Sequence, residues 1–135
     1  MVSLTIVDDL SAAWSARDSE AFAALFADDG VRQEWALPGA LLTGRLEISR
    51  HVRGYMEAVP DCALTIRYAF ERVDGLVIEW TFTGTHTRDL PGLPARGERV
   101  ELPGVSVCEI RDGRLVRESV YWDAATLLSA AGVLA

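Results

Sequence analysis

Three consecutive β-strands are predicted within residues 79–123, and this stretch limits the fold more than any other part of the chain. Its apolar and polar residues alternate, as a sheet with one buried face requires. Asp112-Gly113 is a strong signal for a tight hairpin turn between the last two strands. The first strand places Trp80, Phe82 and His86 on one face. If the sheet is curved, that face predicts a wall of a small-molecule pocket.

The rest of the chain predicts helices early and strands late. Helical spacing covers residues 4–16, 19–26 and 45–59, with Ser3 and Ser19 as candidate N-caps of the first two helices. Asp74-Gly75 predicts a hairpin turn, and Pro103-Gly104 predicts a bulge or an edge-strand bend. The expected strands are residues 31–35, 63–72, 76–85, 100–111 and 114–122, followed by a terminal helix over 124–131.

This order predicts one α+β domain over residues 1–135, in which three early helices pack against a strongly curved antiparallel sheet. Bending such a sheet around helices leaves a cavity at its wide end.

Composition excludes several classes of function. All 13 basic residues are arginine, so lysine Schiff-base chemistry and a P-loop lysine are excluded. The net charge of −7 argues against nucleic acid as a partner. No apolar run approaches the roughly 20 residues that span a bilayer, so we expect no membrane partner.

Cys62 and Cys108 predict buried, reduced thiols in a cytoplasmic protein without a signal peptide. Two histidines without ligand spacing predict no metal site.

Motifs along almost the whole chain resemble those of the SnoaL-like polyketide cyclases. This family lies in the nuclear transport factor 2-like superfamily, together with ketosteroid isomerases and limonene epoxide hydrolases. The resemblance implies a cone-shaped α+β barrel with a curved antiparallel sheet wrapped around N-terminal helices. The matching residues are Phe26–Val31, Gly44, Ile48, Pro60-Asp61, Trp80, Gly84–Thr87, Leu93-Pro94, Gly97, Asp112–Leu115 and Tyr121–Asp123.

Two glutamates are candidate catalytic acids or bases. The resemblance places Glu34 where ketosteroid isomerases carry their proton-abstracting carboxylate, and burial would raise its pKa toward neutrality. The alternative is a strand-edge acid paired with Arg32 or Arg67. On the last strand Glu118 shares one face with Trp122, and the resemblance implies that this face points into the cavity. Two carboxylates there should not both ionise, so one is expected to stay protonated as the acid while the other is the base.

His86 and Asp123 are further catalytic candidates. The imidazole of His86 could relay a proton or bond a substrate oxygen, or it could instead cap the loop over residues 87–97. Asp123 stands between a strand and a helix, so an N-cap is the competing role. His51 is expected at the cavity rim or in a structural role.

A second group of residues is expected to contact the substrate. Trp80, Trp122 and Phe82 could line a flat apolar site, while Trp14 could equally fill the core. The expected substrate-binding residues are Trp14, His51, Trp80, Phe82, Ser106, Val120 and Trp122.

Three positions depart from the family patterns. The oxyanion-hole tyrosine and aspartate of ketosteroid isomerases fall near Leu10 and Ser106, and the aspartate on the last strand of the cyclases falls at Val120. The Arg-x-Asp pairing of the epoxide hydrolases is also missing.

Two functions remain open. The first is a small enzyme without cofactor that performs acid–base chemistry (cyclisation, isomerisation or epoxide opening) on a hydrophobic, polyketide-like molecule. The second is a non-catalytic binding or dimerisation module, for which the missing family residues argue. In either case we expect a homodimer formed through the sheet face that carries Thr81, Thr83, Val105 and Val107.

Overall fold

The computed structural model describes residues 4–36 and 39–133 and confirms the α+β class. Among these residues no helix is long and apolar enough to cross a membrane. The helices are α1 (Thr5–Ser15), α2 (Ser19–Ala23), α3 (Arg45–Ala58) and α4 (Ala124–Ala130). The strands are β1 (Phe26–Glu34), β2 (Ala40–Thr43), β3 (Ala63–Arg72), β4 (Gly75–Thr85), β5 (Arg99–Arg111) and β6 (Arg114–Trp122).

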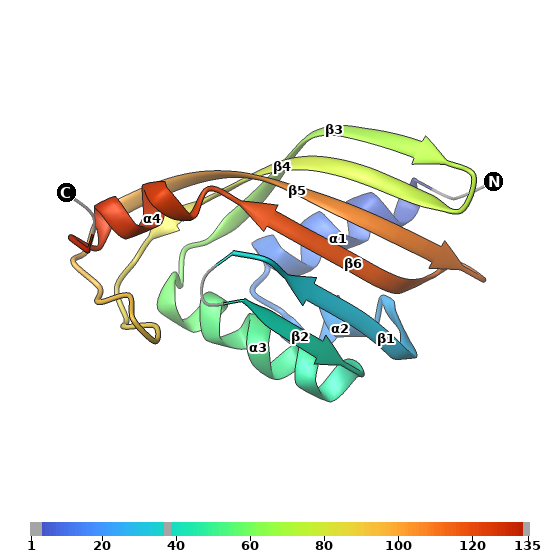
Figure 1. The fold of residues 1–135 in the computed structure, drawn as a ribbon, viewed down its shortest axis with the longest axis horizontal. Helices are drawn as coiled ribbons and strands as arrows, with labels where there is room; N and C mark the ends of the chain where they lie inside the picture. The colour runs from blue at the N-terminus through green and yellow to red at the C-terminus, as the bar shows by residue number, and fades with distance from the viewer. Residues whose placement is uncertain (1–3, 37–38, 134–135) are drawn as a thin grey trace.

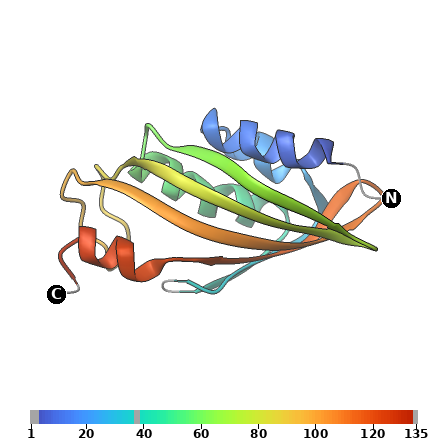
Figure 2. The same cartoon turned by 90° about the horizontal axis from the view of Figure 1, so that it is seen from above.

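The strands form a single curved sheet in the order β2-β1-β6-β5-β4-β3 (Figure 1). Helices α1 and α3 lie on the same side of the sheet, and α4 lies at one end of it, next to the C-terminus (Figure 2). All neighbouring strands are antiparallel except β1 and β6, which are parallel. The sheet is therefore mixed, and the prediction of an antiparallel sheet holds for every pairing but this one.

The first strand begins earlier than the sequence predicts. β1 starts at Phe26 rather than at residue 31, so α2 ends at Ala23. The turn-like residues after Phe26 fit within the strand because the register between β1 and β6 shifts there. The short strand β2, which pairs with the second half of β1, was not predicted at all.

The predicted helix caps also need correction. Ser19 does not cap α2, because the side chain of Asp18 accepts the hydrogen bond from the Ala21 amide at 3.0 Å. The other proposed cap, Ser3, lies outside the described residues. Asp123 does cap α4, as expected, by accepting hydrogen bonds from the amide and the hydroxyl of Thr126.

The hairpin between β3 and β4 turns one residue earlier than predicted. Val73 and Asp74 form the turn, and Gly75 already pairs with Arg72 as the first residue of β4. A methyl group at Gly75 would lie 1.9 Å from the carbonyl oxygen of Cys108. Glycine is therefore needed here for close approach of two strands, rather than for the turn.

The predicted irregularity at Pro103-Gly104 is absent. β5 lies between β4 and β6, and its pairing with β4 runs through both residues without a register shift. Gly104 is required because the indole ring of Trp80 lies across it, where a methyl group would come within 2.2 Å. The pairing of β5 with β6 ends at Gly104 and Trp122, so Pro103 lies just outside it. The missing N–H of the proline therefore removes no hydrogen bond between these two strands.

The inner face of the sheet and the three N-terminal helices share one apolar core. Leu76 and Ile78 of β4 are buried there, together with Leu10 of α1 and Val52 of α3. Both cysteines are free and buried, as expected.

We predict that Gly75→Ala destabilises the fold by ~2 kcal/mol or more, because its methyl group meets a backbone carbonyl that cannot move without breaking the sheet. Gly54→Ala is the matched control: apart from its chain neighbours and the backbone of its own helix, no atom lies within 4 Å of the added methyl group. Alanine in place of glycine inside a helix stabilises by about 0.5–1 kcal/mol. Urea unfolding of both variants measures the difference. Equal stability of the two would contradict the close approach.

Candidate functional site

The inner face of the sheet and the adjacent helices enclose an apolar pocket. Its interior measures about 60 Å³ as the space open to the centre of a water molecule, and one water needs only ~10–15 Å³ on that measure. The pocket can therefore hold a small ring-containing molecule. The pocket is lined by Leu10, Trp14, Arg32, Glu34, Tyr55, Val59, Leu64, Trp80, Phe82, His86, Leu90, Val100, Leu102, Ser106, Glu118, Val120, Trp122 and Leu127.

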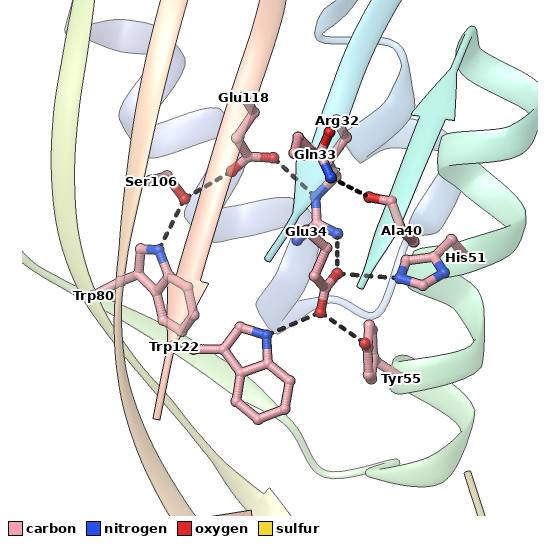
Figure 3. Close-up of polar contacts among 10 residues, drawn as sticks. All are labelled: Arg32, Gln33, Glu34, Ala40, His51, Tyr55, Trp80, Ser106, Glu118 and Trp122. Atoms are coloured by element: carbon pink, nitrogen blue, oxygen red, sulfur yellow. Dashed lines mark hydrogen bonds and ion pairs between the residues drawn. The ribbon is translucent and has the colours of Figure 1, made fainter. Parts of the chain in front are cut away.

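A buried arginine lies between two buried glutamates at one end of this pocket (Figure 3). The Nε atom of Arg32 donates to Glu118 at 2.9 Å, and its Nη1 atom donates to Glu34 at 2.8 Å. The parallel register aligns Arg32 of β1 with Glu118 of β6. Because Arg32 and Glu34 are two residues apart on one strand, both side chains point to the same face.

Glu34 is also bonded to side chains from two other elements. One carboxylate oxygen accepts hydrogen bonds from the Tyr55 hydroxyl at 2.7 Å and from the Trp122 indole at 2.9 Å. The other oxygen, which binds Arg32, lies 3.1 Å from Nε2 of His51. The carboxylate of Glu34 is thus surrounded by polar partners on both oxygens.

These partners decide the charge of Glu34. Burial acts to raise its pKa, but the Arg32 charge and the hydrogen bonds from His51, Tyr55 and Trp122 outweigh burial and lower the pKa from 4.5 to about 2. The expectation that an apolar pocket raises the pKa of Glu34 toward neutrality is therefore wrong. The carboxylate is ionised and stable, and it is a weak base.

We expected one of the two glutamates to stay protonated because the two repel each other, and Glu34 is not that one. That reasoning left out the guanidinium of Arg32, which lies between the two carboxyl groups. Of the two arginines proposed as partners of Glu34, Arg32 is the one that binds it, whereas Arg67 is exposed on β3.

The glutamate charges act in turn on Arg32 and Tyr55. Burial alone would lower the pKa of Arg32, but the charges of Glu118 and Glu34 raise it above its usual range. Burial, together with the charge of Glu34, raises the pKa of the Tyr55 hydroxyl. Both groups therefore keep their protons at neutral pH. Arg32 also lies over the rings of Trp14 and Phe22, 6.0 Å and 5.8 Å from their centroids.

Glu118 has fewer partners than Glu34. One oxygen binds Arg32, and the other accepts a hydrogen bond from the Ser106 hydroxyl at 2.8 Å. Ser106 in turn accepts from the indole of Trp80 at 3.0 Å. This chain fixes the Trp80 ring against Gly104, and it leaves further lone pairs of Glu118 available to a ligand.

His86 lines the pocket as expected, but its imidazole does not cap the following loop. The backbone of His86 pairs with that loop instead, since its amide donates to Glu98 and its carbonyl accepts from Gly97, both at 3.0 Å. The residue exposes only 2% of its surface, and within the described part of the chain its Nε2 atom has no hydrogen-bond partner.

The other predicted residues fall into three groups. Trp14, Phe82, Val120 and Trp122 line the pocket, and Trp14 also packs edge-on against Phe22 and Phe82. His51 touches Glu34 but lies outside the lining. Asp123 also lies outside it, where it caps α4.

In the described ranges 4–36 and 39–133, no group of three or more His, Cys, Asp or Glu residues could hold a metal ion.

Sequence reasoning missed Arg32 and Tyr55 as pocket residues. A signal was present for each: Arg32 is two residues from Glu34 on a strand, and Tyr55 is four residues from His51 on a helix. Which helix face meets which strand is set by tertiary packing, so spacing alone did not bring Tyr55 to Glu34.

With this geometry in place, comparison with known proteins identifies the family. Residues 7–118 match the family model of the SnoaL-like domain, so the chain belongs to the SnoaL-like family. None of the curated proteins matches its sequence.

Solved structures share the fold along nearly the whole chain. A hypothetical protein with the ketosteroid isomerase-like fold from Catenulispora acidiphila DSM 44928, solved with trimethylamine, is 26% identical, with a TM-score of 0.81 and coverage of 95% of this chain and 92% of that one. IdmH from Streptomyces antibioticus, a proposed polyketide cyclase, is 24% identical, with a TM-score of 0.79 and coverage of 96% and 97%. A proposed SnoaL-like polyketide cyclase from Jannaschia sp. CCS1 is 16% identical, with a TM-score of 0.85 and coverage of 98% and 92%.

We predict that Glu34 makes the fold sensitive to acid. Because its pKa is lower in the folded state than the ordinary 4.5, its ionised form stabilises the fold above about pH 4.5, and this contribution is lost as the pH falls through about 2. The shift corresponds to stabilisation on the order of 3 kcal/mol. In urea unfolding, the stability gap between wild type and Glu34→Gln should therefore narrow from neutral pH to about pH 3.

Asp29→Asn is the control for this experiment, because Asp29 is an exposed acid on the same strand. The stability difference between wild type and Asp29→Asn should stay small from neutral pH to about pH 3. A gap for Glu34→Gln that does not change with pH would contradict the lowered pKa.

Proposed function

We propose that this protein is a small, cofactor-independent enzyme that performs acid–base chemistry on a hydrophobic, polyketide-like molecule, with Glu118 as its base. The observation that carries the proposal is a carboxylate with free lone pairs at the polar end of an otherwise apolar pocket. Cyclisation and isomerisation both need a proton removed from a carbon next to a carbonyl group, and a buried carboxylate can remove it.

Glu118 suits this role better than Glu34. The carboxylate of Glu34 is held by Arg32, Tyr55 and Trp122, and its lowered pKa weakens it as a base. Glu118 accepts fewer hydrogen bonds in the described structure. We therefore assign Glu34 a positioning role, in which it holds Arg32 and orients the Trp122 indole.

The remaining pocket residues supply orientation and charge stabilisation. A guanidinium has five N–H groups, and the described carboxylates take one from Nε and one from Nη1 of Arg32. The others can stabilise the oxyanion that forms when a proton leaves the substrate. Trp80, Phe82 and Trp122 form apolar walls that hold a flat substrate over Glu118.

A second candidate is a binding module without catalysis. It is favoured by Val120, which is buried in the pocket where the resemblance to cyclases places an aspartate. A relative 26% identical to this chain was solved in complex with trimethylamine, which supports small-molecule binding on this fold.

We further propose that the protein forms a homodimer through the outer face of the sheet, and that neither nucleic acid nor membrane is its partner. Strand register places Val105 and Val107 on this face beside Glu79 and Val77. Exposed aromatic residues lie on the same face in two stacked pairs, Tyr68 with Phe70 and Trp35 with Tyr121. An apolar face of this kind is typical of a protein interface.

The base can be tested without knowing the natural substrate. 2-Tetralone is a flat ketone with exchangeable protons next to its carbonyl group, and NMR in deuterated water follows their exchange. We predict that the protein accelerates this exchange, and that Glu118→Gln lowers the acceleration about 100-fold or more, as removal of a general base does. Glu109→Gln, an exposed acid on the outer face of β5, should leave it unchanged.

The outcomes separate the two candidates. If the wild type binds 2-tetralone but does not accelerate exchange, the binding module replaces the enzyme. If Glu34→Gln removes activity while Glu118→Gln retains it, the assignment of the base is wrong.

The dimer is tested by sedimentation. We predict twice the chain mass at micromolar concentration, and the mass of one chain for Val107→Arg. The cross-strand partners of Val107 are Val77 and Ser119, so neither offers the buried arginine an opposite charge. Only monomer in the wild type would contradict this proposal.

A further inference from the structure

The end of the pocket around His86 is apolar apart from the imidazole itself. The pocket lining there also includes Val59, which follows α3, Val100 and Leu102 of β5, and Leu90. Leu127 of α4 completes this end and is buried, with 4% of its surface exposed. His86 therefore belongs to the pocket lining, and its buried Nε2 atom has no hydrogen-bond partner among the described residues.

The fold gives no reason for a polar side chain at this position. A buried polar atom without a partner destabilises the fold, and a leucine would fill the same space without that cost. The hydrogen bonds that His86 forms with Glu98 and Gly97 involve only its backbone, and any residue other than proline could form them. A ligand that bonds to Nε2 would remove the cost.

We propose that His86 is a second ligand-recognition point, which binds a hydroxyl or carbonyl oxygen of the substrate at the end remote from Glu118. This inference rests on the ligand-binding role of the pocket proposed above. A hydroxyl group suits either tautomer of the imidazole, because it can donate to a bare nitrogen or accept from an N–H group.

Strand register separates His86 from the charged end of the pocket. Ser106, which binds Glu118, pairs with Ile78 of β4. His86 lies eight residues after Ile78, directly beyond the end of β4 at Thr85. Trp80 and Phe82 lie between these two residues and line the pocket. The ligand class is therefore an elongated molecule with an apolar ring body and an oxygen group at each end.

Paired naphthalene compounds test this class. 2-Naphthol has one hydroxyl group, and 2,6-dihydroxynaphthalene has a hydroxyl at each end of the same rings. In calorimetric titration of the full-length protein, we expect the second hydroxyl to tighten binding about tenfold. His86→Leu should reduce this gain to about twofold or less, while His86→Gln, whose amide can still bond to a hydroxyl, should keep most of it.

The two proposals fail in different ways. If both compounds bind wild type and His86→Leu with the same gain, the pocket binds ligands but His86 does not recognise them, and this inference is overturned. If neither compound binds the wild type, the ligand-binding pocket and this inference fall together.

A second measurement tests the same inference without the His86→Leu variant, which could fail to fold. The chain has two histidines, so nitrogen-15 spectra of the imidazoles contain signals from His51 and His86 alone, and His86→Gln assigns them. Saturation of the wild type with 2,6-dihydroxynaphthalene should shift the Nε2 signal of His86. Binding that leaves this signal in place would overturn the inference.

Discussion

The guanidinium of Arg32 binds the carboxyl groups of both Glu34 and Glu118 inside an apolar pocket, and the arrangement of the pocket depends on this contact. Carboxylates in such surroundings lose hydration that water would otherwise supply, so without a cation they would take up protons. Removal of one member of a buried ion pair costs about 3–5 kcal/mol, because the partner charge is left uncompensated. Arg32 thereby lets Glu34 remain charged.

The same contact joins distant parts of the chain. Arg32 comes from β1 and Glu118 from β6, which are 86 residues apart in sequence but aligned by their parallel pairing. Glu34 then ties this pair to Tyr55 of α3 and to Trp122 at the end of β6. Because the residues that hold the fold together also line the pocket, the polar end of the site is rigid before any ligand binds. Preorganised charges of this kind are the most effective in catalysis.

Much of this site could be predicted from residue alternation along the strands. Alternation placed Trp80 and Phe82 on the inner face of β4 and Glu118 with Trp122 on the inner face of β6, and all four line the pocket. It also directed His86, just beyond the end of β4, toward the same pocket. Successive side chains point to opposite faces in any strand, so the face of a residue can be predicted correctly even when the ends of the strand are not. The α+β class and most strand boundaries were predictable for the same reason.

The electrostatics and the early strands could not be predicted in this way. The pKa of Glu34 depends on contacts with β6 and α3 that no local pattern specifies, and burial without Arg32 gives the wrong direction. The start of β1 was masked by Asp28-Asp29-Gly30, residues typical of a turn, which the strand accommodates through a register shift. Gly75 and Gly104 likewise read as turn or bulge residues, but each is required by close contact with a neighbouring strand or ring.

The most direct test of this account is the charge of Glu34 itself. Carbon-13 NMR of the glutamate carboxyl groups, assigned with Glu34→Gln, follows each carboxylate through an acid titration. The account predicts that the Glu34 signal stays at its ionised position from neutral pH to below the ordinary glutamate value of 4.5 and begins to move only as the pH approaches about 2. Protonation of Glu34 at or above its ordinary value would show that Arg32 does not govern the charge of the pocket.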